Sequence, residues 1–223
     1  MIKNLCVLIP SYNEARTIGR LVADLVRKDF TVYVVDDGST DDTAGIAHLH
    51  GAIVVKHKKN MGKGASLREG FKHIIKKAFD AVIVMDGDGQ HLVSDIGNFI
   101  ERMKATGADM VIGNRMLDVS LMPRERKYTN RFMSSFISIL SGQSVPDSQS
   151  GYRLIKREVL ENIRLKSSNF EIESEMIIRS ARAGFKIESV PIKTVYDNEK
   201  SKVNPVIDTL RFIAFVAKII FTK

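Results

Sequence analysis

Short apolar runs rich in valine and isoleucine recur along the first half of the chain and stop abruptly at polar residues. They lie at residues 5–10, 31–37, 52–57, 81–88 and 109–115. Continuous runs of this length are typical of strands buried on both faces, as in a parallel sheet. Between them, apolar residues repeat at helical spacing, as in residues 18–26 and 67–78. This alternation predicts an α/β fold, a mostly parallel sheet flanked by helices.

The pattern changes after residue 115. A basic, proline-containing loop at 117–127 precedes a helix with one apolar face at 130–142. Helical spacing returns at 170–184, and a further strand is expected at 187–196. The last segment, 206–223, reads as an amphipathic helix, nearly all apolar around a narrow polar face. Such a helix either packs on the domain or lies on a membrane surface.

Composition narrows the class of protein. The chain has 223 residues, 44% of them hydrophobic, which is enough for one sizeable core over residues 1–205. Cys6 is the single cysteine, so neither a disulfide framework nor a cysteine zinc site is expected. No signal peptide is recognisable, and no run reaches the roughly 20 apolar residues that span a bilayer. A cytoplasmic protein is therefore expected. The net charge of +8 suits an anionic partner: nucleic acid, phosphorylated substrate or membrane.

The polar motifs "PSYNE", "DDGST", "DGDGQ" and "GNR" each follow an apolar run. Because ligands of open α/β sheets bind at the carboxyl ends of strands, these motifs are expected to meet in one pocket. In "DGDGQ", Asp86 and Asp88 flank Gly87, and two carboxylates that close together are tolerable if a divalent cation lies between them. A nucleotide diphosphate would supply further oxygen ligands. The alternative is a plain acidic turn.

Two other glycine-containing motifs are less informative alone. "VVDDGSTDDT" is either an ordinary strand–turn–helix junction or a site where Asp36 or Asp37 accepts hydrogen bonds from a base or ribose. "NMGKG" resembles a phosphate loop only superficially, and its alternative is a helix start with Lys63 solvated. No GxGxxG follows the first strand, which disfavours a dinucleotide fold.

Taken together and in order, "LIPSYNE", "VVDDGSTDDT", "NMGKG", "MDGDGQ", "GNR" and "DSQSGYR" resemble the family 2 glycosyltransferases of the GT-A fold. The sequence is most similar to their polyprenyl-phosphate (dolichol-phosphate mannosyltransferase-like) branch, over roughly residues 3–205. The resemblance implies that Asp86, Asp88 and Gln90 serve a Mg²⁺ or Mn²⁺ ion and the diphosphate. It implies a nucleotide-sugar pocket that includes Pro10, Tyr12, Glu14, Asp36, Asp37, Lys63, Asp86 and Gly87.

The chemistry of the acceptor follows from charge. A metal ion neutralises the nucleoside diphosphate that leaves, and the acceptor attacks the anomeric carbon from the opposite side, inverting it. A sugar hydroxyl needs a general base, whereas a lipid monophosphate is already anionic at neutral pH and needs cationic clamps. Arginines gather between residues 115 and 153, where the acceptor side is expected. The expected acceptor-phosphate contacts are Arg115, Arg131, Ser150 and Arg153.

The motif "FEIESEM" keeps a second mechanism open. Many relatives with hydroxyl acceptors have a catalytic carboxylate near this point, and Glu171 and Glu175 would share a helical face. Acidic residues in a first helical turn are also favourable to the helix dipole. The expected catalytic residues are accordingly Asp88, Arg115, Arg153 and Glu175.

The sequence thus predicts a metal-dependent inverting transferase that moves a hexose from a GDP- or UDP-sugar to a polyprenyl phosphate at the cytoplasmic membrane face. The first alternative is a glycosyltransferase with a hydroxyl acceptor and a glutamate base. A sugar-phosphate nucleotidyltransferase would prefer a glycine-rich, arginine-containing loop where this chain has "PSYNEART". A nucleic-acid-binding module would leave the strand-end carboxylates unexplained and lacks interleaved aromatics for base stacking, so no nucleic-acid partner is expected.

Overall fold

A computed structural model describes residues 2, 4–117, 119, 122 and 124–193. The predicted amphipathic helix at 206–223 and the domain boundary before it lie outside the described residues. None of the described helices is both long and apolar enough to cross a membrane.

Seven strands form one sheet in the described part of the chain, in the order β3-β2-β1-β4-β6-β5-β7. All neighbours are parallel except β6, which is antiparallel to both β4 and β5. The predicted α/β class with a mostly parallel sheet is confirmed. The strands are β1 (Leu5–Ser11), β2 (Thr31–Asp36), β3 (Ile53–Lys56), β4 (Ala81–Val84), β5 (Met110–Asn114), β6 (Arg153–Lys156) and β7 (Ile187–Pro191).

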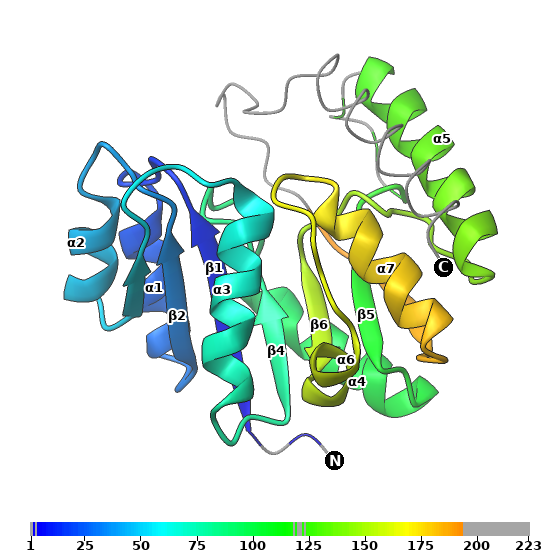
Figure 1. Ribbon diagram of the computed structural model, residues 1–223, viewed down its shortest axis with the longest axis horizontal. Coiled ribbons are helices and arrows are strands. Elements are labelled where there is room, and N and C mark those ends of the chain that lie inside the picture. Colours follow the sequence, from blue (N-terminus) through cyan, green and yellow to red (C-terminus); the bar gives the residue numbers. More distant parts are fainter. Residues whose placement is uncertain (1, 3, 118, 120–121, 123, 194–223) are drawn as a thin grey trace.

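Helices cover both faces of this sheet (Figure 1). One face carries α1 (Ile18–Val26), α2 (Thr43–Leu49) and α4 (Ile96–Thr106), with the short 3-10 helix η1 (Val93–Asp95) beside α4. The other carries α3 (Lys63–Ile75), α5 (Arg124–Ser141), α6 (Arg157–Asn162) and α7 (Ile172–Arg182). Alternate residues of each strand enter the two cores: Leu8 packs with the second group and Val7 with the first.

The antiparallel strand β6 was not predicted from the sequence. It is only four residues long, and Arg153 and Lys156 at its ends mask the apolar pair Leu154 and Ile155. Those two side chains are fully buried on opposite faces of the sheet, which explains why so short a segment holds a central position. Because β6 runs against its neighbours, it begins beside the ends of β4 and β5.

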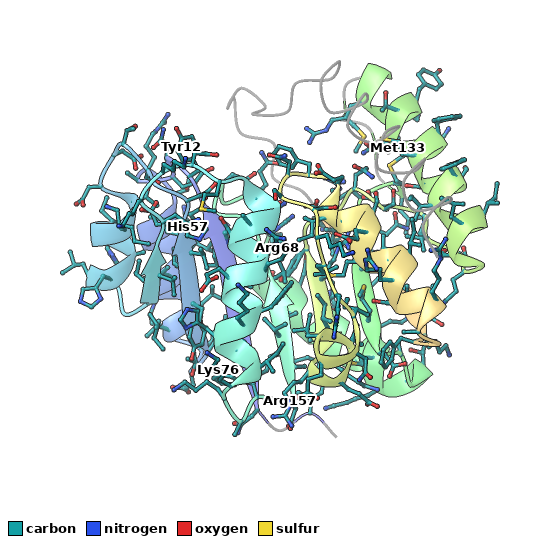
Figure 2. All side chains as sticks on the ribbon, in the orientation of Figure 1. Tyr12, His57, Arg68, Lys76, Met133 and Arg157 are labelled. Atoms are coloured by element: carbon teal, nitrogen blue, oxygen red, sulfur yellow. The ribbon has the colours of Figure 1, made fainter. Side chains whose placement is uncertain are left out.

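The polar loop before β6 therefore joins the motifs that follow the parallel strands. Arg153 lies opposite Val84 of β4 and Ile112 of β5. Tyr12, just after β1, lies at this same end of the sheet, whereas Lys76 and Arg157 lie at the opposite end (Figure 2). The candidate site is built on this end.

Candidate active site

The ends of β1 and β2 bring most of the predicted nucleotide-sugar residues together. Pro10 and Glu14 are buried and Tyr12 is half-buried. The amide of Asp37 donates to the Ser11 carbonyl (2.8 Å), and the amide of Glu14 donates to Thr43 Oγ1 (2.8 Å). These contacts join the "PSYNE" segment to the "DDGST" segment, as the sequence predicted for one pocket.

Asp36 and Asp37 have different surroundings. Asp37 organises the loop before α3: His57 Nδ1 lies 2.7 Å from Oδ1, and the amides of Met61 and Gly62 donate to the two carboxylate oxygens (3.0 and 2.8 Å). Asp36 Oδ1 accepts from the Ser39 amide (3.2 Å). Its buried Oδ2 lies 3.9 Å from the exposed Lys56 Nζ but has no hydrogen-bond partner among the described residues. Asp36 therefore retains an acceptor oxygen, whereas Asp37 mainly shapes the loop.

The acidic turn after β4 is held closely against the β1 segment. Thr17 Oγ1 donates to the Gly87 carbonyl (2.7 Å), and a Cβ on Gly87 would approach Ser11 Oγ to 2.6 Å, so a side chain is excluded there. Asp88 is half-buried, and its Oδ1 accepts from the Gln90 amide (3.0 Å). The turn thus presents Asp86 and Asp88 from a fixed backbone.

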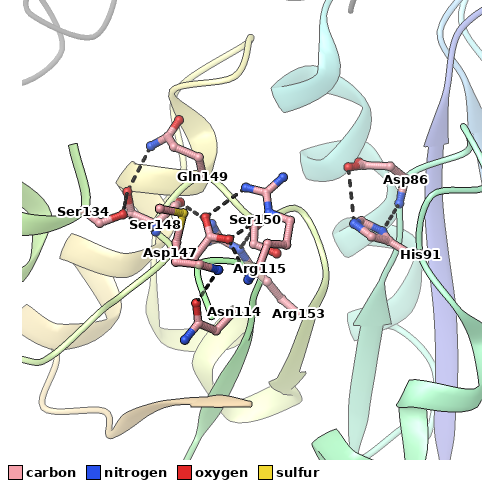
Figure 3. Close-up of polar contacts among 11 residues, drawn as sticks. Asp86, His91, Asn114, Arg115, Ser134, Asp147, Ser148, Gln149, Ser150 and Arg153 are labelled. Carbon is pink, nitrogen blue, oxygen red and sulfur yellow. Dashed lines mark hydrogen bonds and ion pairs between the residues drawn. The ribbon is translucent and has the colours of Figure 1, made fainter. Parts of the chain in front are cut away.

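His91 supports this turn through a contact with its backbone. Its Nδ1 accepts a hydrogen bond from the Asp86 amide (3.1 Å; Figure 3). Its ring stacks on Tyr152 with centroids 4.7 Å apart. Burial lowers the pKa of His91 to about 4, against the opposing effect of Asp86. The imidazole is therefore neutral at physiological pH and serves the turn rather than carrying charge.

Lys63, at the start of α3, is ion-paired rather than solvated. Its Nζ lies 2.6 Å from Asp86 Oδ1 and 2.8 Å from Glu173 Oε1. Burial acts to raise the pKa of Asp86, but the Lys63 ammonium outweighs it and lowers that pKa to about 2. Asp86 is accordingly an ionised, acceptor-only group throughout the physiological range.

The acidic turn suits a hard divalent cation held jointly with a ligand. Across the described residues, no group of three or more His, Cys, Asp or Glu side chains is arranged to hold a metal ion. Asp86 and Asp88 supply two carboxylates and Gln90 an amide oxygen, which are ligand types that Mg²⁺ and Mn²⁺ prefer. Phosphate oxygens of a nucleotide would complete such a coordination sphere.

Arg115 follows β5, on the side where the sequence places the acceptor as an expectation, and binds a buried carboxylate. Its Nε and Nη2 donate to the two oxygens of Asp147 (2.8 and 2.9 Å), and its amide donates to Asp147 Oδ2 (3.0 Å) (Figure 3). Burial acts to raise the pKa of Asp147, but Arg115 outweighs it and holds that pKa below its usual value. This bidentate pair fixes the loop before β6 to the end of β5.

Arg153 has a different environment from the phosphate clamp that the sequence suggested. Its side chain is 1% exposed, and its three nitrogens donate to the backbone carbonyls of Ser148, Ser150 and Glu173 (2.7–2.9 Å). Burial lowers its pKa to about 10, so it stays charged at neutral pH. Arg153 therefore organises the 148–150 loop against α7, because its nitrogens already serve those carbonyls.

The other two predicted acceptor residues differ in exposure. Ser150 is fully buried, and its Oγ has no hydrogen-bond partner among the described residues. Arg131 is exposed on α5. Neighbouring serines tie α5 to the same loop, since the Ser148 amide donates to Ser134 Oγ (2.9 Å). The structure thus gathers Arg115, Ser150 and Arg153 around one loop, with Arg131 on the helix beside it.

Of the three glutamates of "FEIESEM", Glu175 is the least suited to act as a base. Its Oε2 accepts from the amides of Lys166 and Ser167 (2.9 and 2.8 Å), and its Oε1 accepts from Arg179 Nε (2.6 Å). Burial acts to raise the pKa of Glu175, but these hydrogen bonds lower it overall. Both oxygens are engaged in holding the chain, and Glu173 pairs with Lys63. Glu171 is half-buried just before α7.

Several contacts of the site were not anticipated. The partners of Lys63 and of Arg115 come from segments far away in sequence. For the Arg115–Asp147 pair, the only signal in the sequence was the negative charge of Asp147 within "DSQSGYR". His91 Nδ1 accepts a hydrogen bond from the Asp86 amide, which makes His91 part of the acidic turn.

The family model for glycosyl transferase family 2 matches residues 6–164. The chain belongs to this family. It is 32% identical over 203 residues to an undecaprenyl-phosphate mannosyltransferase of Micrococcus luteus, covering 84% of this chain and 82% of that protein. It is 30% identical over 217 residues to a UDP-N-acetylglucosamine–dolichyl-phosphate N-acetylglucosaminyltransferase of Methanococcus voltae, covering 87% and 86%.

Solved structures show the same fold. Glucosyl-3-phosphoglycerate synthase from Mycobacterium tuberculosis, in complex with Mn²⁺ and UDP-glucose, matches with a TM-score of 0.74 over 96% of this chain and 78% of that one, at 21% identity. The predicted GT-A fold and enzyme class are confirmed: the protein is a family 2 glycosyltransferase.

Proposed function

We propose that this glycosyltransferase moves a hexose from a nucleoside diphosphate sugar to a polyprenyl phosphate, with inversion and with a divalent cation. The observation that supports the choice of acceptor is that the buried carboxylates of α7 are already engaged: both oxygens of Glu175 accept hydrogen bonds that hold the chain, and Glu173 Oε1 is paired with Lys63 Nζ. A hydroxyl acceptor needs a general base, whereas a phosphate monoester, with its second pKa near 6, is already a nucleophilic anion.

On the donor side, Asp36 retains an acceptor oxygen for the nucleoside, and the acidic turn faces the diphosphate. Asp86, Asp88 and Gln90 would hold Mg²⁺ or Mn²⁺ together with that diphosphate. The cation supplies charge neutralisation for the nucleoside diphosphate that leaves. Solved relatives of the same fold were crystallised with Mn²⁺ and UDP-glucose, or with Mg²⁺ and UDP, which supports this assignment.

On the acceptor side, Arg115 and Arg131 are the proposed phosphate contacts. Arg115 is oriented by Asp147, and Arg131 is exposed on α5. Arg153 is proposed to act indirectly, because it holds the loop that carries Ser150. The two curated relatives whose names specify lipid phosphates, undecaprenyl phosphate and dolichyl phosphate, support this class of acceptor.

We further propose that α5 rests on the membrane that contains the acceptor. Three large apolar side chains of this helix, Tyr128, Phe132 and Ile139, are exposed, as is Leu117 before it. The helix also carries several cationic residues in its first half. An exposed apolar stripe beside cations is typical of helices that lie in the interface of an anionic bilayer. The predicted helix at 206–223 would be a second contact, on the cytoplasmic face.

The deciding experiment offers the same labelled donor sugar to a polyprenyl phosphate and to the corresponding dephosphorylated alcohol, each with and without Mn²⁺. We expect transfer to the phosphate alone, dependent on Mn²⁺, with release of nucleoside diphosphate. Running GDP- and UDP-sugars in parallel identifies the donor. Equal transfer to both acceptors, or transfer only to the alcohol, would contradict the phosphate acceptor.

A further inference from the structure

The Lys63 ammonium lies between two carboxylates from different parts of the chain. Asp86 belongs to the acidic turn after β4, and Glu173 belongs to α7 on the acceptor side. The side chains of Lys63, Asp86 and Glu173 are 15%, 26% and 5% exposed, so solvent screens their interaction weakly. One positive charge is thus divided between two negative ones, and the group keeps a net negative charge.

Close backbone packing fixes Lys63 in this position. A Cβ on Gly62 or Gly64 would approach the carbonyl oxygens of Ser168 and Ser167 to 2.3 and 2.6 Å, and the Ala65 amide donates to the Ser168 carbonyl (3.2 Å). The start of α3 is therefore seated directly on the loop before α7. Burial acts to lower the pKa of Lys63, but Asp86 and Glu173 outweigh this and hold that pKa above its ordinary value.

Glu173 is fixed as firmly as Lys63. Its backbone carbonyl accepts from Arg153 Nη1 (2.7 Å), which also holds the loop before β6. Its Oε1 binds Lys63, while its buried Oε2 has no hydrogen-bond partner among the described residues. A buried carboxylate with one unpartnered oxygen lowers the stability of the fold, so its retention indicates that its negative charge is used. The charge of Glu173 therefore calls for a role beyond packing.

We propose that Glu173 is a positioning residue for donor binding, acting through Lys63 to keep Asp86 available to the cation and diphosphate. This inference rests on the proposed function, in which Asp86 serves that cation. With Glu173 present, the ammonium is shared, and Asp86 neutralises only part of its charge. Without it, Lys63 and Asp86 become a simple ion pair, and the cation has to compete with the full ammonium charge.

The expected size of this effect follows from residues that support metal ligands from behind. Their substitution typically lowers metal affinity about 10- to 100-fold. Glu173→Gln is nearly isosteric and removes one negative charge, so we expect about a tenfold weaker apparent affinity for Mn²⁺. Glu188→Gln is the control, because Glu188 is also an ion-paired glutamate, but it is half-buried and lies on β7 with Arg102.

The test titrates MnCl₂ in the presence of UDP, and separately GDP, and follows the Mn²⁺-dependent rise in melting temperature and the heat of binding. Wild type and Glu188→Gln should respond at the same Mn²⁺ concentration, and Glu173→Gln at about tenfold more. In a Lys63→Met background, Glu173→Gln should shift the logarithm of the required Mn²⁺ concentration by less than about a third as much. The reason is that Lys63, through which Glu173 acts, is absent. The same tenfold loss in both backgrounds would overturn the inference.

A second variant keeps the test decisive if Glu173→Gln does not fold. Glu173→Asp keeps the charge but shortens the side chain, so it withdraws the carboxylate from Lys63 Nζ, which lies 2.8 Å from Glu173 Oε1. It should also weaken the Mn²⁺ response, by less than Glu173→Gln. If the Mn²⁺ responses of these variants are unchanged, the inference about Glu173 is wrong, but the proposed function is not contradicted. A wild type whose nucleotide binding ignores Mn²⁺ overturns the proposed function, and the inference with it.

Discussion

The two sides of the site use charge differently. On the donor side, the acidic turn presents half-buried carboxylates from a backbone held by Thr17 and His91. On the acceptor side, Arg115 is paired with Asp147, and Arg153 is committed to three carbonyls. In the donor half, Asp86 and Asp88 are thus presented toward the proposed ligand, whereas most charged residues in the acceptor half build the loop that the acceptor is proposed to meet. The density of arginines in a motif is therefore a poor guide to which of them touch substrate.

The largest expected effect is on the donor side. Asp88→Asn should lower turnover by about 100- to 1,000-fold, the usual result of removing one group that stabilises developing charge. Steady-state transfer assays measure it, with the unfolding curve as the check on the fold. Asp24→Asn is the control and should be active, because Asp24 is a half-buried residue of α1 that pairs with Arg27. Near-normal, metal-dependent activity of Asp88→Asn would show that its assignment is wrong.

Arg153→Met tests whether Arg153 stabilises the loop before β6 or contacts the acceptor phosphate directly. It removes three charge-assisted hydrogen bonds from a fully buried group, and we expect a loss of about 3–5 kcal/mol in the free energy of unfolding. Urea unfolding measures this loss. Arg157→Met removes an exposed pair with Glu161 and an exposed hydrogen bond to the Lys77 carbonyl, and it should change stability by less than about 1 kcal/mol. A fully stable Arg153→Met that lost only acceptor transfer would restore the direct phosphate clamp.

Asp147→Asn should lower stability at neutral pH by about 3 kcal/mol, because it leaves Arg115 without its carboxylate. The folded pKa of Asp147 lies below its ordinary value of 3.8, so its contribution is complete above that pH and is lost as the pH falls through the folded pKa. The difference between wild type and variant should therefore shrink as the pH is lowered below about 4. Unfolding curves at pH 7 and pH 3 measure it, and an equal difference at both would contradict the ion pair.

The smallest effect concerns the membrane. Arg131→Ala should weaken binding to vesicles that contain phosphatidylserine by about fivefold, since one surface cation contributes about 1 kcal/mol. Lys76→Ala removes a cation from the opposite end of the molecule (Figure 2) and should leave binding unchanged. Co-sedimentation measures both. Equal losses in the two variants would indicate general electrostatic attraction rather than a surface centred on α5.

The parallel part of the fold was predictable because most of its strands are continuous apolar runs, several of which end in a polar motif. Strand β6 was not, because a reversed strand of four residues with charged ends leaves little pattern. The acidic turn was predictable for a related reason: its chemistry is local. The Lys63–Glu173 pair joins residues 110 positions apart along the chain, so no spacing rule reports it. Sequence patterns also cannot reveal whether an arginine's nitrogens meet carbonyls or solvent.

The reversed strand also bears on how the enzyme can diversify. Residues 115–152 leave the sheet at the end of β5 and return at the start of β6, where Ile112 lies opposite Arg153 and the Gly113 amide donates to the Tyr152 carbonyl (2.9 Å). The two ends of this segment are therefore neighbours, whatever its length and sequence. Doubling the length of a flexible loop costs only about 0.6 kcal/mol in closure entropy. Recombination between relatives can thus exchange the acceptor-side segment as one cassette while the donor half keeps its paired strands.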